Sequence, residues 1–213
     1  MRRPEFIAKQ GRHPSGILGS LLASVMAAET AAENALALEL LEIQPTDNVL
    51  EVGYGHGRTI ASAAGAARTG LVAGVDWSER MLRVATRYNR RLISEGRVEL
   101  KLSSSNKLPY PDCQFDRVYS VHTIYFWASP TEDLLQIARV MKRGARFVLG
   151  FRPSDERTST DFPEGIYRHY APDEVRALLN DSGFEDVQIM DRRLSHRPMC
   201  FIAARRVGSI EGP

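Results

Sequence analysis

An apolar run that leads into a glycine-rich loop constrains this chain more than any other feature. Residues 49–52 predict a buried parallel strand, and the stretch 59–67 beyond the loop has the periodicity of a helix. Between them, Gly53, Gly55 and Gly57 stand at alternate positions. Glycine permits a sharp turn and lets a ligand approach bare backbone amides, while the N-terminus of the following helix favours an anion. The segment therefore predicts a strand, a ligand-binding loop and a helix of an α/β sheet.

The spacing of these glycines separates two classes of ligand. A dinucleotide-binding loop has the pattern G-x-G-x-x-G, but Arg58 occupies the third glycine position here and Gly57 comes one residue early. Glu51 stands two residues before the first glycine, which completes the pattern E-x-G-x-G-x-G. This pattern resembles the first motif of the class I S-adenosylmethionine-dependent methyltransferases, of the small-molecule type similar to methyltransferase domain 11. A tight strand–helix turn without a ligand is the alternative interpretation.

The resemblance implies a cofactor site on this loop. In the family the glycine loop holds the methionine end of S-adenosylmethionine, and the acidic residue, here Glu51, helps to place the amino group of the cofactor. Tyr54 lies inside the loop and joins the expected cofactor-binding set. Gly53, Gly55 and Gly57 complete that part of the set.

Apolar stretches along the chain predict the rest of the sheet. The last two such stretches are joined by a polar loop too short for a parallel crossover, so they should pair as antiparallel neighbours. The resemblance likewise implies an α/β doubly wound, mostly parallel seven-stranded sheet with an antiparallel C-terminal strand. Further strands are expected at 71–75, 98–102, 117–121, 146–151, 187–190 and 199–204.

Two helix starts can be predicted from their capping residues. Ser78 precedes an amphipathic stretch and is a suitable N-cap. The run Ser129–Glu132 has the form of a capping box, with Pro130 at the first helical position.

The chain divides at about residue 44. Residues 1–44 predict an N-terminal helical extension that serves as a lid, and residues 45–207 a single S-adenosylmethionine-binding domain. The apolar stretch 17–28 follows several basic residues and loosely resembles a secretory signal. Gly19 interrupts this stretch, and its length is too short to span a bilayer. We therefore expect a cytoplasmic protein with no membrane partner.

Composition narrows the classes of partner. A net charge of +2, from 28 basic and 26 acidic side chains, does not favour nucleic acid as a partner. The two cysteines, Cys113 and Cys200, are far apart and form no pattern typical of a metal site, which favours a reducing compartment. We expect no metal ion, and a monomer or homodimer.

Two segments are expected to bind the adenosine part of the cofactor. Asp76 ends the second predicted strand, where its carboxylate can accept hydrogen bonds from a ribose diol; a helix N-cap is the alternative role. The resemblance implies that Trp77 flanks the adenine. Further on, Ser104 occupies the position at which the family has an acidic residue for the adenine edge, which is a departure from the family pattern. Ser105 can donate its backbone N–H to the ring.

The acceptor side is less specified. His122 and Tyr125 follow the fourth predicted strand, where the family's substrate pocket opens, and we take them as candidate catalytic residues. A structural role is the alternative for each. The resemblance implies methyl transfer from S-adenosylmethionine to an oxygen, nitrogen or carbon of a small-molecule acceptor. A non-catalytic S-adenosylmethionine-binding regulatory module, or transfer to a peptide or lipid, is the alternative function.

Overall fold

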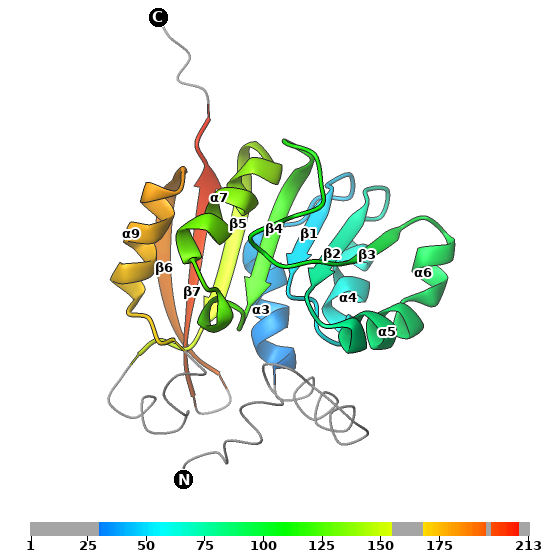
Figure 1. Cartoon of the computed structure of the whole chain (residues 1–213), viewed down its shortest axis with the longest axis horizontal. Coiled ribbons are helices and arrows are strands. Elements are labelled where there is room, and N and C mark those ends of the chain that lie inside the picture. Colours follow the sequence, from blue (N-terminus) through cyan, green and yellow to red (C-terminus); the bar gives the residue numbers. More distant parts are fainter. Residues whose placement is uncertain (1–29, 155–167, 195–196, 209–213) are drawn as a thin grey trace, which may run out of the picture.

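The protein forms one seven-stranded mixed sheet with helices on both faces (Figure 1). The computed structural model describes residues 30–154, 168–194 and 197–208. The strands lie in the order β3-β2-β1-β4-β5-β7-β6. They are β1 (Val49–Val52), β2 (Val72–Asp76), β3 (Val98–Leu102), β4 (Phe115–Val121), β5 (Met141–Phe151), β6 (Phe184–Leu194) and β7 (Arg197–Arg206).

Pairing within the sheet confirms the predicted topology. Strands β1 to β5 pair in parallel, whereas β7 pairs antiparallel with both β5 and β6. The chain order reverses between β1 and β4, since β1 has β2 on one side and β4 on the other. In open α/β sheets such a switch point is where ligands bind, outside the carboxyl ends of the strands.

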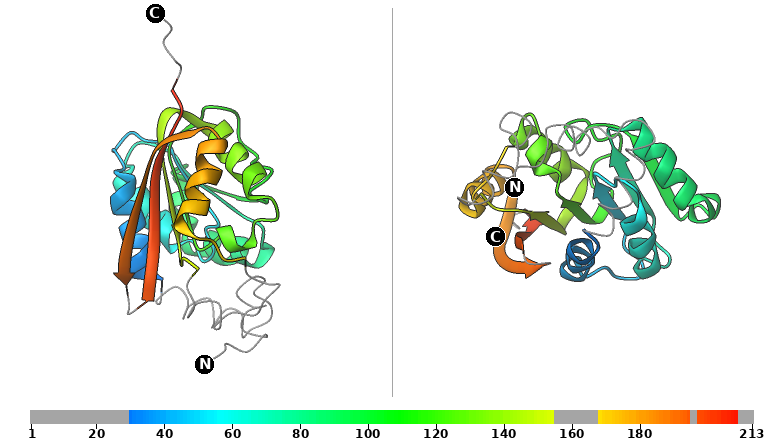
Figure 2. Two further views of the ribbon diagram at one scale, coloured as in Figure 1. Left: turned by 90° about the vertical axis from the view of Figure 1, so that its left-hand side faces the viewer. Right: turned by 90° about the horizontal axis from the view of Figure 1, so that it is seen from below.

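Helices cover the two faces of the sheet in separate groups (Figure 2). The apolar cluster on one face includes residues of α7 and α9, and the cluster on the other face includes residues of α3, α4 and α5. Strands β1 and β2 are buried along their whole length, as expected for parallel strands covered on both faces. The helical elements are α3 (Ala31–Leu41), α4 (Arg58–Ala66), α5 (Glu79–Tyr88), α6 (Arg90–Ser94), the 3₁₀ turn η1 (Ile124–Phe126), α7 (Pro130–Val140) and α9 (Pro172–Asp181).

The two predicted helix starts have different outcomes. Ser78 caps α5, because its side-chain oxygen accepts a hydrogen bond from the backbone N–H of Met81 at 3.4 Å. Helix α7 begins at Pro130 as predicted, but Ser129 makes no side-chain cap, so the predicted capping box is wrong. The backbone N–H of Ser129 donates instead to the carboxylate of Asp133. A residue one turn into the helix therefore orders its N-terminus.

Helix α3 is the described part of the N-terminal extension. Its Ala37 and Leu41 are fully buried in the cluster that contains Tyr119 and Val148 of the sheet, so α3 shares the core of the domain. The remainder of the extension, residues 1–29, lies outside the described residues, and its role as a lid stays a prediction. Within the described ranges, no helix has the length and apolar character needed to cross a bilayer.

Candidate functional site

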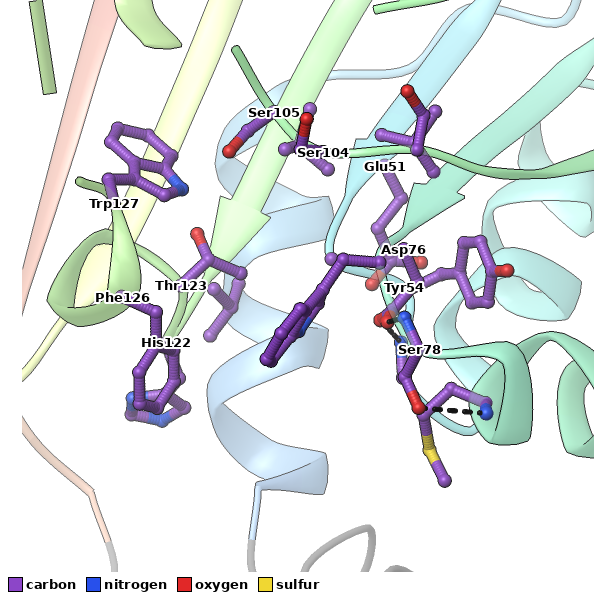
Figure 3. Close-up of a pocket in the computed structure, with 18 of the residues that line it drawn as sticks. Glu51, Tyr54, Asp76, Ser78, Ser104, Ser105, His122, Thr123, Phe126 and Trp127 are labelled. Carbon is purple, nitrogen blue, oxygen red and sulfur yellow. Dashed lines mark hydrogen bonds between the residues drawn. The ribbon is translucent and has the colours of Figure 1, made fainter. Parts of the chain in front are cut away.

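A cavity of about 370 Å³ opens at the carboxyl ends of β1, β2 and β4, at the switch point of the sheet. Its volume falls within the range of about 300–1,000 Å³ that is usual for small-molecule sites. Figure 3 shows two walls. Tyr54, Asp76 and Ser78 lie on one side, the segment after β4 lies on the other, and Ser104 and Ser105 lie between them. The segment after β4 contributes His122, Thr123, Phe126 and Trp127.

The three loop glycines all adopt positive φ, but for different reasons. A Cβ at Gly53 would lie 2.3 Å from Cγ2 of Thr123, and one at Gly57 would lie 2.6 Å from Cβ of Ala85. These two positions need glycine because the loop packs closely against other elements. A Cβ at Gly55 would meet nothing within 4 Å, and Gly55 lines the cavity. Space is thus left where a ligand can approach the backbone.

Asp76 joins the glycine loop to the end of β2. Its Oδ2 accepts a hydrogen bond from the backbone N–H of Gly55 at 2.9 Å, and its Oδ1 accepts one from Ser78 at 2.9 Å. Burial raises the pKa of Asp76, although these backbone hydrogen bonds oppose the rise. Each oxygen retains acceptor capacity toward the cavity. The carboxylate and the open glycine position therefore fit the ribose and methionine parts of S-adenosylmethionine.

Glu51 lies on the cavity wall with almost no solvent exposure. Its Oε2 accepts a hydrogen bond from the hydroxyl of Tyr119 at 2.8 Å. Burial raises the pKa of Glu51 to about 8; the bond from Tyr119 opposes this rise, and the charge of Asp76 adds to it. At neutral pH the carboxyl group of Glu51 therefore holds a proton. An approaching cation favours the ionised carboxylate and so the release of that proton. An ammonium group such as that of the cofactor's methionine end suits this position.

The two aromatic residues of the expected set are placed differently. Tyr54 is 2% exposed, its ring lies over Gly74 of β2, and its hydroxyl donates to the carbonyl of Lys101 at 3.4 Å. This side chain anchors the loop to the sheet. Trp77 is 47% exposed and lines the cavity, a position from which an indole can flank a planar ligand.

Ser104 and Ser105 both line the cavity, and both side chains already have partners. The hydroxyl of Ser104 donates to Oδ1 of Asn106 at 2.6 Å. The hydroxyl of Ser105 donates to Oδ1 of Asp133, from the first turns of α7. The turn that carries the two serines is therefore fixed to α7.

His122 belongs to a closed network of hydrogen bonds and charges. Its Nε2 is 2.5 Å from Oε2 of Glu33, and its Nδ1 is 3.2 Å from the hydroxyl of Tyr125. Arg152 donates its backbone N–H to the same hydroxyl, and its guanidinium lies 3.6 Å from Oε1 of Glu33. His122 also has φ +61°, which is uncommon for a residue other than glycine and is found at functional sites.

The charge of Glu33 determines which atoms of this network carry the shared hydrogens. Burial raises the pKa of Glu33, but the hydrogen bonds and charges of His122 and Arg152 outweigh burial and leave that pKa below its ordinary value. Glu33 is thus a carboxylate, and Nε2 of His122 carries the hydrogen between them. In the neutral imidazole Nδ1 is then an acceptor, to which the Tyr125 hydroxyl donates. Tyr125 is 8% exposed and contacts His122 without being among the described residues that line the cavity.

The tertiary structure adds residues that the sequence did not single out. Glu33 and Asp133 are acidic and buried, and they contact His122 and Ser105 from helices. Glu33 is 89 positions from His122, so no local sequence pattern predicts that the two side chains are in contact. The sequence pattern around Asp133 did hold a signal, because an acidic residue on a face otherwise lined by Leu134 and Ala138 is unusual for a buried helix stripe.

Comparisons with known proteins bear on the family and the fold of the chain. The profile of the family described as "Methyltransferase domain" matches residues 50–149. The "O-methyltransferase cnsE" of Penicillium expansum is 28% identical over 163 residues, which cover 72% of this chain and 58% of that relative. The "Uncharacterized methyltransferase YdaC" of Bacillus subtilis (strain 168) is 29% identical over 170 residues, covering 80% of this chain and 89% of that relative.

A solved structure supports the fold. A SAM-dependent methyltransferase from Aquifex aeolicus superposes with a TM-score of 0.69 at 24% identity, covering 82% of this chain and 90% of that chain. Sequence profile, relatives and fold point the same way and support a class I S-adenosylmethionine-dependent methyltransferase. The protein is accordingly an enzyme whose cofactor is S-adenosylmethionine. Its match spans little more than half of the fungal relative's length.

Proposed function

We propose that the protein methylates a hydroxyl oxygen of a small-molecule acceptor, with His122 as the general base. The observation that carries this proposal is the placement of His122 on the cavity wall, paired with a buried carboxylate. The name of the fungal relative, an O-methyltransferase, supports the choice of oxygen. Phe126 and Trp127 line the same wall and would supply apolar surface for an organic acceptor.

Cofactor binding would involve the residues that fit its parts. S-adenosylmethionine, when bound, supplies an activated methyl group on a sulfonium. We place its methionine end at Glu51 and the glycine loop, and its ribose at Asp76. Trp77 would flank the adenine. The main contribution of this wall is orientation, since holding two reactants in line can lower a barrier by about 7–11 kcal/mol.

His122 would remove the acceptor's proton. An acceptor hydroxyl that replaces the Tyr125 hydroxyl as partner of Nδ1 can pass its proton to that nitrogen. The resulting imidazolium would be stabilised by the carboxylate of Glu33 on the opposite ring nitrogen. Glu33 is then a positioning residue, because it acts through His122, whereas Tyr125 holds Nδ1 only until the acceptor displaces its hydroxyl. General-base catalysis of this kind contributes about 10²–10⁴-fold.

The test compares acceptor classes and one matched pair of variants. Phenols, anilines and thiophenols with the same ring substituents would be screened by release of S-adenosylhomocysteine. We expect turnover with phenols, a fall in kcat of about 10²–10⁴ for His122→Ala, and unchanged affinity for S-adenosylhomocysteine. His56→Ala, in the glycine loop, is the control for loss of a cavity-lining imidazole. Preference for anilines, or an unchanged kcat in His122→Ala, would refute the role of His122.

A further inference from the structure

The turn that should recognise the adenine edge has no carboxylate of its own. Ser104 stands at the position where an acidic residue is expected, and its hydroxyl proton is directed to Asn106 at 2.6 Å. A serine in that arrangement offers no charge to an exocyclic amine. Hydrogen bonds to ionised acceptors are roughly twice as strong as neutral ones, so the loss is substantial.

A carboxylate from another element lies at the same turn. Asp133, in the first turns of α7, is 3% exposed, lines the cavity and accepts the hydroxyl hydrogen bond of Ser105. The loop of Ser104 and Ser105 is thus attached to α7 through this one acid. Buried carboxylates are uncommon unless they have partners, and two carboxylate oxygens retain acceptor capacity for one further donor besides Ser105, Ser129 and the backbone N–H of Asp133 itself.

The other carboxylates of the cavity lie elsewhere. Among the described residues that line it, the acidic side chains are those of Glu51, Asp76 and Asp133. Glu51 is bonded to Tyr119 of β4, and Asp76 is bonded to the glycine loop at the end of β2. Asp133 is therefore the lining carboxylate that is bonded to the serine turn.

We propose that Asp133 accepts a hydrogen bond from the exocyclic amine of the cofactor's adenine, so that a carboxylate on α7 acts where Ser104 lacks one. Asp133 is then a specificity-determining residue. A carboxylate only accepts hydrogen bonds, so it favours the 6-amino group of adenine and repels the 6-oxo group of hypoxanthine. The consequence is selection of adenosyl over inosyl cofactors.

The test uses binding alone, with S-adenosylhomocysteine and S-inosylhomocysteine as ligands in calorimetric titration. Wild-type protein should bind the adenosyl ligand at least about tenfold more tightly, as expected for one hydrogen bond to a charged group. Asp133→Asn presents an oxygen to an amine and an amide N–H to an oxo group. We expect this variant to reduce the preference by about tenfold or more, mainly by improving the inosyl ligand.

Two controls separate recognition from structure. Glu132→Gln removes the same charge from the neighbouring exposed position of α7 and should leave the preference unchanged. Ser105→Ala removes the bond to Asp133 and should weaken both ligands to a similar degree, without changing their ratio.

The outcomes are distinct. A reduced preference in Asp133→Asn, with both controls as expected, supports the proposal. An equal weakening of both ligands in Asp133→Asn would mean that Asp133 only holds the serine turn, and it would overturn the proposal. No preference in the wild-type protein would overturn it as well. Because no acceptor is used, these results are independent of the role proposed for His122.

Discussion

In the absence of cofactor, the Glu51→Gln variant should be more stable than the wild type at alkaline pH, even though Glu51 is placed at the cofactor. The carboxyl group is buried, and its folded-state pKa is about 8 against an ordinary value of 4.5. Between these two pH values the folded protein holds a proton that the unfolded chain has released. The free energy of unfolding therefore falls as the pH rises through this window and levels off above about pH 8.

The size of the effect follows from the pKa difference. Raising the pKa of Glu51 from 4.5 to about 8 corresponds to a loss of the order of 5 kcal/mol across the whole window. Between about pH 5.5 and pH 8 the expected loss is roughly 3 kcal/mol. Glutamine stays neutral and keeps an oxygen for the hydroxyl of Tyr119. The variant should therefore lack this contribution to the pH dependence.

Urea unfolding of both proteins at several pH values between about 5.5 and 8.5 measures the difference directly. The other titrating groups are common to both proteins, so we expect the variant to gain roughly 3 kcal/mol relative to the wild type as the pH rises. Tyr119→Phe is a second check, because it removes the hydrogen bond that lowers the pKa of Glu51 and should extend the window to higher pH. Curves for Glu51→Gln and wild type that run parallel within about 0.5 kcal/mol would show that Glu51 is already ionised when folded.

Three further predictions concern the cofactor wall. Binding of S-adenosylmethionine at about pH 7 should release a proton from Glu51, seen as a dependence of the calorimetric enthalpy on the buffer, which Glu51→Gln should abolish. Gly53→Ala should cost about 1–3 kcal/mol of stability, because the added Cβ meets Thr123 and the residue has positive φ. Gly55→Ala should lose less stability but more affinity for S-adenosylhomocysteine. Denaturation and titration of both variants test this, and a larger stability loss in Gly55→Ala with a larger affinity loss in Gly53→Ala would contradict it. Asp76→Ala should lower both stability and affinity, since it leaves two backbone N–H groups without their acceptor; an unchanged affinity would mean that the ribose site is misplaced.

Local features of the fold were predictable because neighbouring residues determine them. The strand–loop–helix at Gly53 depends on residues a few positions apart, and so does the cap at Ser78. The antiparallel pairing of β6 with β7 followed from the short connection between them. Prediction failed at Ser129, where the carboxylate of Asp133 accepts the backbone hydrogen bond. It also failed at the start of β5. This strand begins at Met141 and not at Arg146, because Met141 pairs with Phe115 of β4.

Glycines at fixed spacing and an acid at the end of a strand act through their own backbone segment, so the class of protein and the residues of the glycine loop could be predicted from the sequence. The surroundings of the candidate site residues, in contrast, follow from contacts between distant parts of the chain. Glu33 contacts His122 across 89 positions, and Asp133 contacts Ser105 across 28. Such contacts arise because the sheet brings the ends of separate elements to one edge, and no periodicity along the chain records which side chains meet there.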